Sequence, residues 1–143
     1  MKITIGRIDK ADFPELSLEE IDIKIDSGAY TSSIHCSDIN EVTLNNNPFI
    51  TFTLLDPEHP FYNNKKFTFQ NYTSKVVKSS NGISEKRFMI QTEIRIFNTT
   101  FPIYLTLTER KDMKFPILLG RKFLNKKFVI DTSKTNLSYK SKK

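Results

Sequence analysis

The chain has 143 residues, which is the length of one domain with a single hydrophobic core, and we expect one domain over residues 1–143. Its net charge of +6 is scattered except at Lys140–Lys143, which we expect to be a frayed, solvated terminus rather than a nucleic-acid contact. The lone Cys36 excludes an intramolecular disulfide, and no apolar run approaches the roughly 20 residues that cross a bilayer. We expect the N-terminus not to be a signal peptide, because its apolar stretch is short and soon interrupted by charge, and we therefore expect a cytoplasmic location.

Alternation of apolar and polar residues predicts strands along most of the chain. In chain order, the expected strands cover residues 3–5, 21–26, 49–55, 66–69, 86–96, 100–108 and 127–131. Asn81-Gly82 favours a tight hairpin, and Phe97–Thr99 favours a second turn. The best helical segment, Arg121–Lys126, is short and directly follows Gly120. The sequence therefore predicts an all-β protein, a closed barrel or sandwich, with one short C-terminal helix.

The strand that contains Ile21, Ile23 and Ile25 runs directly into Asp26-Ser27-Gly28, followed by Ala29. Gly28 allows the backbone to turn sharply and to approach a neighbouring chain closely. The amides that follow can donate to the Asp26 carboxylate, and the Ser27 hydroxyl can hold the loop. Taken alone, the tripeptide can also be interpreted as an ordinary turn without a function, because Asp, Ser and Gly are all turn formers.

A second motif lies near the C-terminus, where the apolar strand Phe115–Leu119 ends in Gly120 and Arg121 opens the short helix. The pair of motifs resembles that of aspartic proteases, in which a strand of two apolar residues and a glycine packs beneath an Asp-Thr/Ser-Gly loop. Arginine and a helix after that glycine are similar to the retroviral type, and the Asn-Gly hairpin lies where a flap is expected.

Over nearly the whole chain, the sequence resembles a bacterial family of retropepsin-like proteins labelled ATP-dependent zinc proteases, which are often found beside ATP-grasp ligases. The similar segments are residues 5–7, 14–16 and 24–29 with Thr31, Ser32 and His35, residues 77–80 with Gly82 and 84–87, residues 107–110 with Asp112 and Met113, and residues 118–121. The chain departs from the family at Ser27, Tyr30 and Ile83, where Thr, Arg and His are usual. The resemblance implies a closed retropepsin-like barrel with the acid-protease fold.

The residues of this chain do not support the words "ATP-dependent" and "zinc" in that label. ATP binding predicts a G-x-x-x-x-G-K-[ST] motif, which the four glycines do not form. Zinc binding predicts a ligand cluster, whereas the nitrogen and sulfur candidates are His35, His59 and Cys36. His35 and Cys36 are adjacent, so a strand would point them to opposite faces, and we expect His35 to be structural. The sequence thus predicts no cofactor and no metal.

The resemblance implies protease chemistry, which needs two carboxylates about 3 Å apart that share one proton and activate a water. The chain has one Asp-Ser-Gly, and Asp131-Thr132-Ser133 lacks the glycine. We therefore expect a homodimer in which Asp26 of each subunit, with Ser27 and Gly28 shaping the loop, hydrolyses a peptide or amide bond. Two alternatives stay open: a non-catalytic peptide- or partner-binding module on the same barrel, and metal-assisted hydrolysis by Asp26 and His35.

The expected substrate contacts surround this loop. They are Ala29, the flap-like turn Ser79, Ser80, Asn81 and Gly82, and the arginines Arg87 and Arg121. Each arginine has the alternative of a structural salt bridge, and the turn that of a plain hairpin. The neighbourhood implied by the resemblance suggests a peptide or a protein with ligated amino acids as substrate and an ATP-grasp ligase as partner, with no nucleic acid and no membrane.

Overall fold

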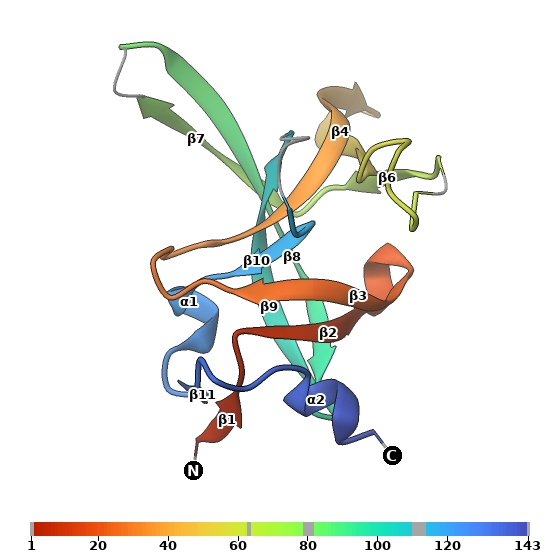
Figure 1. Cartoon of the computed structure of the whole chain (residues 1–143). Helices are drawn as coiled ribbons and strands as arrows, with labels where there is room; N and C mark the ends of the chain where they lie inside the picture. Colours follow the sequence, from red (N-terminus) through yellow and green to blue (C-terminus); the bar gives the residue numbers. More distant parts are fainter. Residues whose placement is uncertain (1, 63, 79–81, 110–113, 143) are drawn as a thin grey trace.

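The computed structural model describes residues 2–62, 64–78, 82–109 and 114–142 (Figure 1). The strands are β1 (Ile3–Ile5), β2 (Ile8–Phe13), β3 (Leu18–Ile25), β4 (Ser32–Leu44), β5 (Asn47–Leu54), β6 (Lys66–Phe69), β7 (Tyr72–Lys78), β8 (Ser84–Ile96), β9 (Thr99–Thr108), β10 (Ile117–Leu119) and β11 (Phe128–Ile130). The helical segments are the 3-10 turn η1 (Pro14–Leu16) and the helices α1 (Arg121–Leu124) and α2 (Leu137–Lys140). None of the described helices is long and apolar enough to span a membrane.

Six of these strands close into a barrel, as the sequence predicted. They follow the order β10-β3-β2-β8-β9-β4, and β4 pairs with β10 to complete the ring. Closure leaves these six strands without the unpaired edge of an open sheet. Beyond the ring, β5 and β6 extend from β4, and β7 pairs with β8 in a hairpin that projects away from the barrel (Figure 1).

The interior of the barrel is filled by the apolar positions of the alternating strands. In β3 the alternating residues Ile21, Ile23 and Ile25 are buried, as expected. In the β8–β9 hairpin, the buried apolar side chains are Ile90, Ile94, Ile96, Ile103, Leu105 and Leu107. The residues between them, at odd positions of β8 and even positions of β9, lie on the outer face of this hairpin because side chains alternate along a strand.

The turn between β8 and β9 was expected and has the geometry of a two-residue hairpin. Phe97 and Asn98 have positive φ values of 53° and 57°, and Ile96 pairs with Thr99. Two successive positive φ values match the right-handed twist of the flanking strands. The other expected turn is only partly visible, because Ser79, Ser80 and Asn81 lie outside the described residues, whereas Gly82 has a φ of 84°.

The expectation of one short C-terminal helix was incomplete, because α2 is a second one. The expected frayed terminus begins inside this helix, since Lys140 is its last residue. Lys142 Nζ also lies 3.5 Å from the Asp12 carboxylate, so this part of the basic tail is held against β2. The second helix was missed because it is held by a contact between distant parts of the chain, which the local sequence does not reveal.

That contact is made by the fully buried carboxylate of Asp9 in β2. Asp9 Oδ2 accepts the N–H of Ser138 at 2.8 Å, and Oδ1 accepts the N–H of Tyr139 at 3.1 Å, so both oxygens satisfy amides at the start of α2. Ser138 Oγ in turn accepts the N–H of Phe97 at 2.7 Å. These bonds join β2, the β8–β9 turn and the C-terminal helix.

Replacing Asp9 by Ala should therefore lower the free energy of unfolding by about 2–4 kcal/mol, because the amides of Ser138 and Tyr139 lose a buried acceptor. Urea titration measures this change. The matched control is Asp22→Ala, which removes an exposed carboxylate bonded to Lys10 and should cost less than about 1 kcal/mol. Equal losses in the two variants would contradict this role of Asp9.

Candidate active site

Asp26 is the first residue after β3, and backbone bonds fix its loop. Its N–H donates to the carbonyl oxygen of Leu119 in β10 at 2.9 Å. Its carboxylate Oδ1 accepts the N–H of Gly28 at 3.1 Å, and the N–H of Ala29 donates to its carbonyl oxygen at 3.2 Å. The side chain is half-buried, so the loop holds a carboxylate that faces solvent on one side.

The loop is supported by β10, which lies between two other strands. β10 runs parallel to β3, with Leu119 opposite Ile25, and antiparallel to β4, with Ile117 opposite Ile34. The next residue, Gly120, passes so close to the chain that a Cβ there would lie 2.5 Å from the carbonyl oxygen of Thr31. Only glycine fits this crossing, which explains the two apolar residues and glycine that the sequence places here.

The start of α1 holds the loop from its other end. The N–H groups of Arg121 and Lys122 donate to the carbonyl oxygens of Ala29 and Tyr30 at 2.9 and 2.8 Å. Arg121 Nη1 donates to the carbonyl oxygen of Ser27 at 2.8 Å, and its guanidinium lies over the ring of Tyr30. Arg121 is therefore bonded to the loop itself. The sequence had suggested either a substrate contact or a structural salt bridge for this residue.

Asp26 opens onto a cavity of about 360 Å³. Ala29 and Arg87, both expected as substrate contacts, line the same cavity. Ser27, Gly28, Gly82 and Arg121 do not line it, and the turn residues Ser79, Ser80 and Asn81 lie outside the described part of the chain. The structure thus gathers Asp26, Ala29 and Arg87 at one place and leaves Gly82, at the exposed end of the β7–β8 hairpin, apart from them.

Two carboxylates in this cavity were not selected from the sequence. Glu85 and Glu109 line it together with Asp26. Glu85 pairs with Arg87 at 3.6 Å, and Glu109 Oε1 accepts the N–H of Asp38 at 3.2 Å. Both lie within segments that resemble the protease family, which is a signal that could have identified them.

His35 and Cys36 have structural surroundings. His35 is buried, with Nε2 2.8 Å from Asp56 Oδ2 and Nδ1 3.3 Å from the carbonyl oxygen of Thr108. Cys36 is fully buried, and burial raises the pKa of its thiol, which disfavours the thiolate that binds metals. Within the described ranges, no group of three or more His, Cys, Asp or Glu side chains is arranged to hold a metal ion. The surroundings of His35 and Cys36 therefore do not fit a zinc site.

The close crossing of Gly120 gives a direct test of the support beneath the loop. Gly120→Ala should lower the free energy of unfolding by about 2–3 kcal/mol, because the new methyl group overlaps the backbone of Thr31. Gly28→Ala is the matched control, since its Cβ would lie 3.4 Å from Asp26 Oδ1, an ordinary contact. Chemical denaturation compares the two, and an unchanged stability of the Gly120 variant would refute the constraint.

The chain is similar in sequence to a segment of longer curated proteins. The chain is 37% identical over 139 residues to a probable alpha-L-glutamate ligase of Shewanella pealeana and 32% identical over 134 residues to one of Desulfotalea psychrophila. These alignments cover 94% and 91% of this chain but only 29% and 28% of the relatives, so the chain spans less than a third of their length.

A solved structure and a family model identify the fold and the family. The crystal structure of a Legionella pneumophila protein of unknown function matches 96% of this chain and 99% of its own, with a TM-score of 0.70 at 24% identity, which shows a shared fold. Residues 4–141 match the model of the RimB-like family, described as the retropepsin-like aspartic endopeptidase RimB. The chain therefore belongs to the RimB-like family of retropepsin-like aspartic endopeptidases.

Proposed function

We propose that the protein is an aspartic peptidase or amidase that works as a homodimer, in which Asp26 of each subunit activates a shared water. The observation that carries this proposal is the Asp26 loop: a half-buried carboxylate, bonded to the N–H of Gly28 and open to a cavity of about 360 Å³. Membership in an aspartic endopeptidase family supports the same chemistry. One carboxylate acts as base toward the water, and the other donates to the oxygen of the scissile carbonyl.

The second carboxylate has to come from another subunit. Across the part of the chain that the structure describes, no hydrogen bond or ion pair joins Asp26 to another carboxylate. Glu85 and Glu109 line the same cavity, but one pairs with Arg87 and the other accepts a backbone N–H. A two-fold axis beside the loop would bring together two copies of Asp26, and the exposed Tyr30 next to the loop is an apolar side chain that a partner would cover.

The other expected site residues take supporting roles in this proposal. Ser27 and Gly28 shape the loop, and Arg121 fixes it through the carbonyl oxygen of Ser27. Ala29 and Arg87 contact the substrate from the cavity wall. Substrate contact by Ser79, Ser80, Asn81 and Gly82 stays a prediction from the sequence, because the first three lie outside the described residues.

The names of the relatives point to a substrate and a partner. Proteins named probable alpha-L-glutamate ligase contain a segment similar to this chain within a longer sequence. A hydrolase joined to a ligase suits the removal of residues that the ligase has added. We therefore assign α-linked glutamyl peptides, free or attached to a protein, as the substrate and a ligase of the ATP-grasp type as the partner, in the cytoplasm.

A non-catalytic binding module is the second candidate, because one subunit alone offers a single Asp26. The substitution Asp26→Asn separates the two functions. It should reduce the hydrolysis of an α-linked glutamyl peptide by at least about 10³-fold and leave peptide binding intact, because the amide keeps the shape but cannot act as the base. Mass spectrometry of the products and fluorescence anisotropy measure these two properties.

The control is Asp131→Asn, which alters the Asp-Thr-Ser sequence near the C-terminus and should leave the rate unchanged, since Asp131 is bonded to Ser133. Turnover by the Asp26 variant at the wild-type rate would rule out the proposed chemistry. Binding without turnover by the wild-type protein would support the binding module.

The shared site also predicts how the rate depends on protein concentration. Hydrolysis per mole of protein should rise in parallel with the fraction of dimer, because a monomer holds half of the catalytic pair. Analytical ultracentrifugation and activity measurements over the same concentration range compare the two curves. Full activity in a sample that is monomeric throughout would contradict a site made by two subunits.

A further inference from the structure

The Asp26 cavity is one end of a longer trough along the outer face of the β8–β9 hairpin. A middle cavity of about 200 Å³ shares Arg87 and Thr106 with it. A third cavity of about 300 Å³ shares Met89 with the middle one, and Thr31 lines all three. The three cavities are therefore neighbours, and a peptide that crosses Asp26 in an extended conformation along this hairpin would pass all of them.

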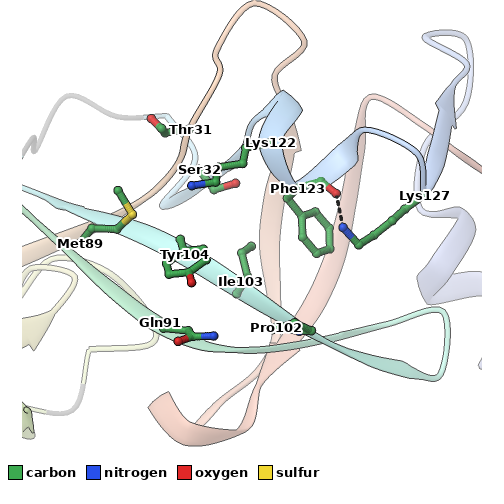
Figure 2. A pocket seen from close by; sticks show the side chains of 10 residues that line it. All are labelled: Thr31, Ser32, Met89, Gln91, Pro102, Ile103, Tyr104, Lys122, Phe123 and Lys127. Atoms are coloured by element: carbon green, nitrogen blue, oxygen red, sulfur yellow. Dashed lines mark hydrogen bonds between the residues drawn. The ribbon is translucent and has the colours of Figure 1, made fainter. Parts of the chain in front are cut away.

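The third cavity, here called the α1 slot, lies between the hairpin and the α1 segment. Figure 2 shows Lys122 and Phe123 of α1 on one side and Ile103, Tyr104 and Gln91 of the hairpin on the other. Lys127, just beyond α1, lies at the far end of the slot (Figure 2). Ile103 and Phe123 are buried, so the floor of the slot is apolar, while the two lysines supply charge.

Charge is distributed unevenly along the trough. Asp26, Glu85 and Glu109 line the first cavity, whereas no described residue that lines the middle cavity or the α1 slot is acidic. The slot instead holds Lys122 and Lys127, and neither forms an ion pair with a carboxylate in the described ranges. This end of the trough therefore complements an anionic group.

Each of the two ammonium groups lies over an aromatic ring. Lys122 Nζ lies 4.8 Å from the centre of the Tyr104 ring, and Lys127 Nζ lies 5.0 Å from that of Phe123. Lys127 Nζ also donates to the carbonyl oxygen of Phe123 at 3.0 Å, the bond drawn in Figure 2. Cations that are already positioned lose less side-chain entropy when they bind an anion.

A carboxylate at the end of a short aliphatic side chain suits both parts of this slot. The methylene groups would pack against Met89, Ile103 and Phe123, and the carboxylate would accept bonds from the lysine ammonium groups. A purely apolar side chain would leave both cations without an anionic partner. A bare anion would leave the apolar floor exposed to water.

We propose that the α1 slot is a subsite for an acidic side chain of an extended peptide, and that Lys122 and Lys127 set this preference away from the bond at Asp26. The subsite rests on the proposed function in one respect, namely that the same peptide lies across the Asp26 cavity. The subsite adds to the proposed function the two lysines that select a peptide with an acidic side chain. They belong to a segment distant in sequence from both the Asp26 loop and the hairpin.

The experiment measures binding without cleavage, in the Asp26→Asn background. The probe is a fluorescein-labelled hexapeptide of α-linked glutamate with an amidated C-terminus, and its affinity is obtained from fluorescence anisotropy. Lys122→Gln together with Lys127→Gln should weaken binding about tenfold at low salt, and the loss should shrink at high salt because screening weakens charge pairs. The same comparison is made with peptides in which one Glu is replaced by Gln. When the replaced residue is the one that occupies the slot, the lysine variant and its parent should bind the peptide with equal affinity.

The matched control is Lys24→Gln with Lys126→Gln, which removes the same charge from lysines that line none of these cavities. Its affinity should stay within about twofold of the parent. Because Lys127 bonds to the carbonyl of Phe123, its loss can loosen α1. Lys122→Gln alone, which loses only a ring contact, is therefore measured as well, together with the melting temperature of each variant.

Three results would overturn the subsite: no loss of affinity, an equal loss for every single-Gln peptide, or a loss seen only with a free C-terminal carboxylate. Hydrolysis of the unlabelled peptide by the wild-type protein is measured in parallel. Lysine-dependent binding without hydrolysis would reject the proposed function and keep the subsite. Hydrolysis without any dependence of binding on the lysines would reject the subsite alone.

Discussion

The structure depends on the passage of β10 between β3 and β4. This short strand closes the barrel, and its last residue, Leu119, accepts the N–H of Asp26. The crossing is possible because Gly120 has no side chain where it meets the backbone of Thr31. From there the chain turns into α1, which bonds to the carbonyl oxygens of the Asp26 loop. Closure of the fold and placement of the carboxylate are thus consequences of the same contact.

Much of this arrangement could be predicted from the sequence, because its signals are local. The alternation of Ile21, Ile23 and Ile25 indicated a buried strand, and Phe97-Asn98 indicated a tight turn. The pairing of the Asp26 loop with Gly120 came from a resemblance to proteases, since no periodicity connects residues so far apart. Local pattern and family likeness therefore supplied different parts of the fold.

The parts that were missed depend on contacts between distant residues. The helix α2 is held by Asp9, whose carboxylate receives amides from the other end of the chain. An isolated helix of one turn is unstable in water, so its own sequence carries little information about it. The cavity residues Glu85 and Glu109 were missed for a similar reason, because only the folded barrel brings β8 and the end of β9 beside Asp26.

The position of α1 links the Asp26 loop to the α1 slot. Its first residue, Arg121, bonds to the Asp26 loop, while the next residue, Lys122, lies over Tyr104 in the slot at the other end of the trough. A shift of this helix would therefore move the loop and the slot together. In the proposed function, the distance between the scissile bond and the acidic side chain is consequently set by this one segment. If the two proposals hold together, the charge of the substrate is recognised at a fixed spacing from the bond that is hydrolysed.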